Sequence, residues 1–72
     1  MTAIEAWPEV RALVLKKLND GPTNICRISH IFLRRHFGLS DEAIQQVRDI
    51  CASDDDELTC EDYMGDLRFD RR

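Results

Sequence analysis

The chain has 72 residues, of which 43% are hydrophobic and 33% charged, and its formal net charge is −4. These values are typical of one small globular domain and exclude a collagen-like or disordered chain. No apolar run reaches the ~18–20 residues of a membrane span, which excludes a transmembrane protein. The first residues lack the basic start and apolar stretch of a secretion signal, so we expect a cytoplasmic protein.

The charges are distributed unevenly along the chain. Residues 1–39 carry six basic and three acidic side chains, a net charge of +3. Residues 40–72 carry four basic and eleven acidic side chains, a net charge of −7. This division predicts a basic face and an acidic face on one small body, and the acidic face would attract a basic partner. The alternative is that both faces only keep the protein soluble.

A first helix is predicted to begin near Pro8, because proline is tolerated at the first helical position. Its apolar stripe consists of Trp7, Val10, Val14 and Leu18. The run Asn19-Asp20-Gly21-Pro22 predicts its end. Thr2 and Glu5 have the spacing of a capping box, but a helix that began there would contain Pro8 in its interior. We therefore expect residues 1–6 to form a loose turn.

Two further helices are predicted on either side of Gly38. The first is capped by Thr23 or Asn24 and runs to about Phe37. Its apolar residues cover more than one helical stripe, so we expect it to be the central helix. These residues are Ile25, Ile28, Ile31, Phe32 and Leu33. The next helix is capped by Ser40 and has acidic residues in its first turn, where they suit the helix dipole. Its buried stripe consists of Ile44, Val47, Ile50 and Cys51.

The last segment follows a polar acidic loop at residues 52–57, and the sequence allows two predictions of its structure. Thr59 followed by Asp62 at the capping-box spacing favours a short helix. The alternative is a hairpin of strands Leu58–Met64 and Leu67–Arg71 that turns at Gly65-Asp66. Residues 69–72 are expected to be loose. The predicted fold is all-α: one domain, 1–72, of three to four helices with a helix-turn-helix-like arrangement. Because so small a core is marginal, a homodimer is one way to stabilise it.

The run from His30 to Arg48 resembles a helix-turn-helix unit. Leu33 and Phe37 close its first helix, Gly38 makes the turn, and later apolar residues return to the same core. Together with Lys17-Leu18-Asn19-Asp20-Gly21-Pro22, it is similar to the core of winged-helix-like regulators over residues 8–52. The resemblance implies that residues 40–49 form the helix that enters a DNA groove. Arg34 departs from it, because a small residue is usual at that position.

The leading hypothesis is a small non-enzymatic regulator, an inhibitor or adaptor, that binds a protein with a basic surface. Its target would belong to the transcription machinery or another nucleic-acid-binding system. The predicted docking residues are Asp41, Glu42, Asp49, Asp54, Asp55, Asp56, Glu57, Glu61 and Asp62. A third reading is a dimerisation module in which the acids only keep the protein soluble.

The alternative function is a helix-turn-helix DNA-binding transcriptional repressor. Its contacts would be Arg27, Arg34, Arg35, Gln45, Gln46 and Arg48, with Arg71 and Arg72 on phosphates. Glutamine can read adenine, but Asp41, Glu42 and Asp49 on the groove-facing helix would oppose phosphate binding. DNA binding is therefore the less favoured reading.

No catalytic, cofactor or metal site is predicted. The sequence lacks a phosphate-binding glycine loop, a serine elbow and a His-Glu-x-x-His motif. Three cysteines without Cys-x-x-Cys spacing indicate reduced thiols rather than a disulfide framework. Cys26 and His30 stand four residues apart, which is only a weak indication of a zinc site.

Overall fold

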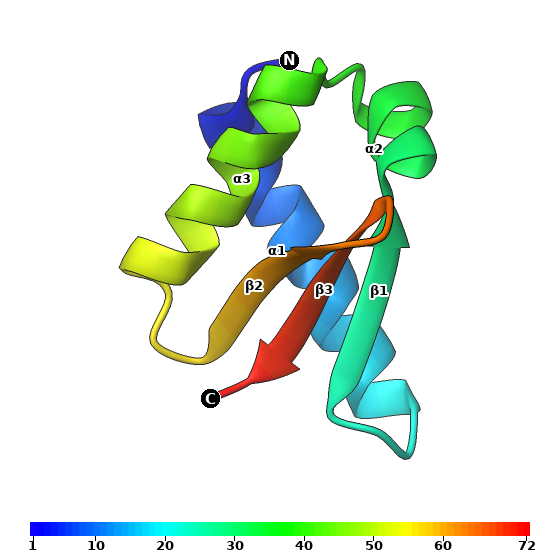
Figure 1. Cartoon of the computed structure of the whole chain (residues 1–72). Helices are drawn as coiled ribbons and strands as arrows, with labels where there is room; N and C mark the ends of the chain where they lie inside the picture. The colour runs from blue at the N-terminus through cyan, green and yellow to red at the C-terminus, as the bar shows by residue number, and fades with distance from the viewer.

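A three-stranded antiparallel sheet packs with three helices, so the expected all-α fold is wrong. The computed structural model describes residues 1–72. Its elements are α1 (Ala3–Asp20), β1 (Ile25–Ser29), α2 (His30–Phe37), α3 (Asp41–Asp54), β2 (Leu58–Tyr63) and β3 (Asp66–Arg71). The strand order is β1-β3-β2, with β3 in the centre. In Figure 1, α1 passes behind the sheet, α3 lies beside β2, and α2 follows the end of β1.

Helix α1 begins at Ala3 rather than near Pro8, so residues 3–6 are helical and not a loose turn. The capping box forms: the Thr2 N–H donates to Glu5 Oε1 at 2.9 Å, and the Thr2 hydroxyl accepts from the Glu5 N–H at 3.2 Å. Ala3 and Ala6 are also buried. The cap and this burial offset the missing N–H of Pro8, which is exposed inside the helix. None of the helices is long and apolar enough to cross a membrane.

The segment predicted as the second helix divides into strand β1 and helix α2. In β1, Cys26 and Ile28 are buried whereas Ile25 and Arg27 are exposed, which is the two-residue period of a strand covered on one face. The Ser29 hydroxyl then accepts from the Phe32 N–H at 3.0 Å and caps α2. A single helix over the whole segment would not account for this alternation of burial or for the cap at Ser29.

Helix α3 forms where it was expected, after the turn at Gly38. Gly38 has a φ of 66°, the left-handed conformation that glycine adopts at least cost. The Ser40 hydroxyl accepts from the Ala43 N–H at 3.1 Å and caps the helix. The helix continues to Asp54, which is further into the acidic segment than the sequence predicted.

The last segment is the hairpin β2–β3, and the preferred short helix is wrong. Leu58 and Cys60 of β2 are buried, as are Leu67 and Phe69 of β3, so each strand alternates between covered and open sides. Met64, at φ 49°, and Gly65, at φ 86°, form the turn. The end of the chain is not loose either, because Phe69 is fully buried in β3.

The hydrophobic core contains 17 buried residues, and every helix and strand contributes to it. The ring of Trp7 in α1 stacks on Phe69 in β3, with ring centroids 6.3 Å apart. This contact fixes α1 against the covered face of the sheet. The opposite face of the sheet carries no helix (Figure 1).

Candidate functional site

The outer face of α3 carries a polar stripe formed by Glu42, Gln46 and Asp49. These residues follow one another at steps of four and three, which places them on one side of the helix, and all three are exposed. No lysine or arginine belongs to this stripe. The α3 stripe therefore presents two carboxylates and an amide to solvent.

An apolar pocket lies between the α3 stripe and the start of α1. It has a volume of about 320 Å³ and is lined by Ala3, Ile4, Gln46, Asp49 and Ile50. The side chain of Ile4 contributes most of the exposed apolar surface, because it is 77% exposed. The pocket and the stripe together form an apolar centre with a polar, acidic border.

Two of the predicted docking carboxylates have arginine partners at the surface. Asp41 Oδ1 lies 3.3 Å from Arg34 Nε, and Asp49 Oδ1 lies 3.1 Å from Arg48 Nη2. Both carboxylates are well exposed in these pairs. Exposed ion pairs of this kind contribute only ~0.2–1 kcal/mol, so either carboxylate can exchange its arginine for another cation.

Asp55, a predicted docking residue, is instead buried, with 8% of its surface exposed. Its Oδ2 accepts from Arg11 Nε at 2.6 Å, and its Oδ1 accepts from the N–H groups of Glu57 and Leu58 at 2.9 and 2.8 Å. Burial raises the pKa of Asp55, but these hydrogen bonds outweigh it, so the pKa lies below its ordinary value. Asp55 joins α1 to the start of β2 and is not available to a partner.

Asp62 is likewise engaged within the fold. Its Oδ2 accepts from Gln45 Nε2 at 2.8 Å, and its Oδ1 lies 2.9 Å from His30 Nε2. The hydrogen bond from Gln45, followed by the influence of His30, lowers the pKa of Asp62. This carboxylate connects β2 to the start of α2 and to α3, which is a positioning role.

The remaining predicted acids do not form one continuous face. Glu57 lies 3.0 Å from Arg11, whereas Glu42, Asp54, Asp56 and Glu61 have no side-chain partner. Glu61 is opposite Arg68 on the uncovered face of the sheet, away from α3. The acidic surface around α3 that a partner can reach therefore consists of Asp41 and the α3 stripe, with Asp54 and Asp56 beyond the end of the stripe.

The basic residues proposed for DNA contact are spread over several elements. The guanidinium of Arg27 lies over the ring of Tyr63 on the open sheet face, 5.4 Å from its centroid. Arg34 pairs with Asp41, and Arg48 is half-buried beside Asp49, while Arg35 of α2 has no ion-pair partner. Gln45 is bonded to Asp62, whereas Gln46 stays exposed in the α3 stripe.

The two C-terminal arginines are also held within the fold. Arg71 Nη2 donates to Asn19 Oδ1 at 2.6 Å. Arg72 donates from Nε and Nη2 to the carbonyls of Asp55 and Ala52, at 2.9 and 3.0 Å. Arg72 therefore satisfies carbonyl groups at the end of α3 instead of extending toward a phosphate.

The three cysteines are all free and buried. Cys26 lies in β1 and His30 in α2, and no group of three His, Cys, Asp or Glu side chains is placed to hold a metal ion. Burial raises the pKa of Cys26. The neighbouring Cys51 thiol of α3, together with burial, raises the pKa of Cys60 in β2.

Sequence reasoning missed a second pocket, beside β1 and between α1 and α2. It has a volume of about 530 Å³ and is lined by Leu13, Lys17, Arg27, Ile28, Ser29, Phe32 and Asp66. The two-residue alternation in β1 is one of burial, and the sequence does not show it, because Ile25 is apolar but exposed. Reading the segment as a helix concealed the pocket.

No protein-family model matches this chain, and neither does any curated protein or solved structure.

Proposed function

We propose that this protein is a small non-enzymatic regulator, an inhibitor or adaptor in the cytoplasm, that binds a basic protein surface through α3. The observation that carries the proposal is the α3 stripe of Glu42, Gln46 and Asp49 beside the pocket of Ile4 and Ile50. An apolar centre with a polar rim is the usual composition of a protein-binding surface. The carboxylates would speed encounter with a cationic partner and fix its orientation.

The arrangement of the elements supports a helix-turn-helix unit of the winged type. The chain order is helix, strand, helix, helix, strand, strand, and Gly38 makes the turn between α2 and α3. In such a unit α3 would be the helix that faces DNA. A transcription component or another nucleic-acid-binding protein, which itself carries a basic surface, is the partner class that this charge pattern favours.

A DNA-binding repressor is the second candidate, and the same arrangement of elements favours it. The charge of α3 opposes it, because most affinity for DNA comes from lysine and arginine that displace counterions from phosphates. The α3 stripe offers two carboxylates, and Arg34 and Arg48 are paired with Asp41 and Asp49. Arg35 alone would have to supply the phosphate contacts near this helix.

The test compares two charge reversals that change the net charge equally. Glu42→Lys with Asp49→Lys reverses the α3 stripe, whereas Glu9→Lys with Asp20→Lys reverses two exposed and unpaired acids of α1. A partner is first captured from nuclease-treated host lysate, identified, and purified. Its affinity for each variant is then measured by titration calorimetry at low and high salt.

We expect the α3 reversal to weaken binding at least about tenfold, because it places like charges opposite the partner. The α1 reversal should change the affinity less than about threefold, and salt should weaken wild-type binding. Equal losses in both variants would contradict the proposal. Tight binding of duplex DNA that Arg35→Ala weakens would support the repressor instead.

A further inference from the structure

Strand β1 is an edge strand, since it pairs with β3 alone. At one end of this pair the Arg71 N–H donates to the Asn24 carbonyl at 3.3 Å. At the other end the His30 N–H donates to the Gly65 carbonyl at 2.9 Å. In an antiparallel ladder, residues whose backbone groups face the neighbouring strand alternate with residues whose groups face away. In β1, the backbone N–H and C=O groups of the even-numbered residues between these two hydrogen bonds therefore face β3.

The odd-numbered positions of β1, Ile25, Arg27 and Ser29, turn their N–H and C=O groups toward the free edge. The Ile25 carbonyl accepts from the Thr23 hydroxyl at 3.1 Å. The backbone groups of Arg27 have no partner among the side chains, turns or loops of the protein. The centre of the edge thus offers one donor and one acceptor to an added strand.

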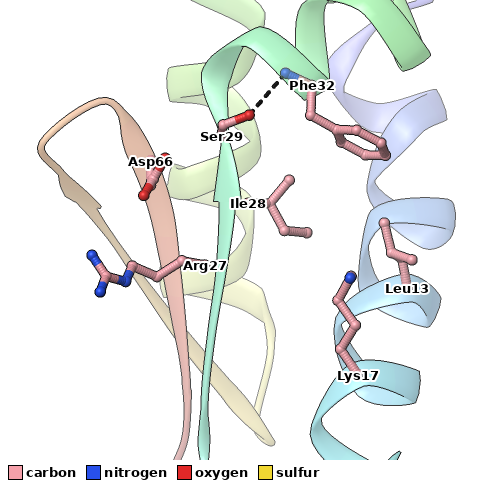
Figure 2. Close-up of a pocket in the computed structure, with 7 residues that line it drawn as sticks. All are labelled: Leu13, Lys17, Arg27, Ile28, Ser29, Phe32 and Asp66. Carbon is pink, nitrogen blue, oxygen red and sulfur yellow. Dashed lines mark hydrogen bonds between the residues drawn. The ribbon is translucent and has the colours of Figure 1, made fainter.

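The 530 Å³ pocket lies against this edge. In Figure 2, the side chains of Leu13, Lys17, Ile28 and Phe32 project into the space between β1 and α1, whereas Arg27 lies on the other side of the strand. Phe32 is 37% exposed, so part of its ring is open to an incoming group. An added strand would place alternate side chains into this apolar space.

The charges beside the edge indicate what the other side chains of that strand should be. Lys17 and Arg27 border the pocket from opposite sides of β1. Neither forms an ion pair within the chain, and the guanidinium of Arg27 lies over the ring of Tyr63 on the open sheet face, where a carboxylate of an added strand would have to draw it toward the edge. One carboxylate, Asp66, opposes these two cations in the lining. A second copy of β1 fits poorly, because pairing the whole strand with itself would set Arg27 opposite its own equivalent.

We propose that the free edge of β1 binds an extended peptide segment of a partner protein in which acidic and apolar residues alternate. The segment adds a fourth strand to the sheet and bonds the backbone of Arg27. Its apolar side chains enter the pocket beside Ile28 and Phe32, and its acidic side chains lie beside Arg27. This surface is separate from the α3 stripe, so the inference does not rest on the function proposed above.

The probe is the synthetic peptide acetyl-Glu-Val-Glu-Leu-Glu-Val-Glu-amide with a fluorescent label, and binding is followed by anisotropy. Arg27→Pro removes the edge N–H, which does not belong to the ladder with β3, while Arg27→Ala removes only the side chain. Thermal unfolding by circular dichroism checks that both variants fold. We expect Arg27→Pro to bind about tenfold more weakly than Arg27→Ala, the effect of one lost hydrogen bond.

Two controls use the unmodified protein and do not depend on the folding of a variant. The first control uses two N-methylated peptides, one methylated at the odd-numbered residues and the other at the even-numbered residues. If the peptide forms backbone hydrogen bonds with the edge of β1, one of the two should lose binding. A peptide with Lys in place of Glu should bind at least tenfold more weakly. The proposal is overturned if both N-methylated versions bind like the parent, if the parent does not bind, or if the two Arg27 variants bind equally. Self-association that Arg27→Pro abolishes would assign the edge to a second copy and also overturn it.

Discussion

The buried carboxylate of Asp55 connects helix α1 to the start of strand β2. It accepts hydrogen bonds from Arg11 of α1 and from the two backbone groups that begin β2. The side chain of Asp55 is only 5% exposed, whereas that of Arg11 is 31% exposed. Removing the charge of such a carboxylate leaves the arginine without its main partner.

We expect Asp55→Asn to lower the free energy of unfolding by ~1.5–3 kcal/mol at pH 7, the usual worth of hydrogen bonds to a charged group. The pKa of Asp55 is lowered in the folded protein, so its stabilisation is complete above the unfolded pKa and is lost as the pH falls through the folded pKa. The difference between wild type and variant should therefore shrink below about pH 4. Urea denaturation at a series of pH values measures it.

Glu57→Gln is the matched control, because Glu57 contacts the same arginine but its side chain is 62% exposed. Its effect should stay below ~1 kcal/mol. A difference for Asp55→Asn that persists unchanged at acidic pH would show that the charge is not what stabilises this junction.

The place of Asp55 could not be read from the sequence. It stands in a run of acids, Asp54 to Glu57, and such a run normally lies at the surface. Its partner Arg11 is 44 residues away in the chain. Local pattern gives the charge of a residue, but only tertiary packing decides which member of an acidic run turns inward.

At the scale of elements, capping signals predicted correctly where α3 begins and where α2 ends. Ser40 and Gly38 act through contacts within a few residues, so their effect is visible locally. Strand β1 was predicted as helix because its partner is distant in the chain: Cys26 is paired with Phe69. The β2–β3 hairpin is local and was the alternative prediction for its segment, but the helix-capping pattern at Thr59 was preferred to it. A short alternation such as that in β1 is decided by pairing that the segment itself does not contain.

The turn of the β2–β3 hairpin contains an unfavourable residue. Met64 has a φ of 49° and is 89% exposed, so its left-handed conformation is not offset by burial. Asparagine followed by glycine is the preferred pair for a two-residue turn with positive φ at both positions. Met64→Asn should raise the free energy of unfolding by ~0.5–1 kcal/mol, measured by urea denaturation.

Met64→Ala is the control for this change, because alanine loses the side chain and keeps the same backbone cost. Its effect should stay within ~0.5 kcal/mol. Equal gains from asparagine and alanine would mean that the exposed thioether, and not the backbone, is unfavourable.

At the scale of the molecule, the acidic half of the chain does not form one acidic face, because Asp55 and Asp62 are held within the fold whereas the α3 stripe stays exposed. The core is shared by every element, and Trp7 of α1 stacks on Phe69 of β3. We therefore expect one cooperative unfolding transition. Tryptophan fluorescence, which reports on this stack, and far-ultraviolet circular dichroism should give the same midpoint.

A variant at Phe69 tests whether the core unfolds as one unit. Phe69→Leu should lower both midpoints together, with a loss of ~1–3 kcal/mol from the shortened side chain and the lost aromatic contact. If the fluorescence midpoint moved while the dichroism midpoint stayed, the hairpin and α1 would unfold separately from the rest.

The burial of all three thiols has a consequence for handling the purified protein. In the folded molecule the thiols of Cys26, Cys51 and Cys60 are covered by the core and are not presented to oxygen or to a neighbouring chain. Covalent oligomers can therefore arise only from molecules that have opened. An opened chain that closes one internal disulfide still keeps a third reactive sulfur, so ageing at high temperature should yield disulfide-linked aggregates at the rate of opening.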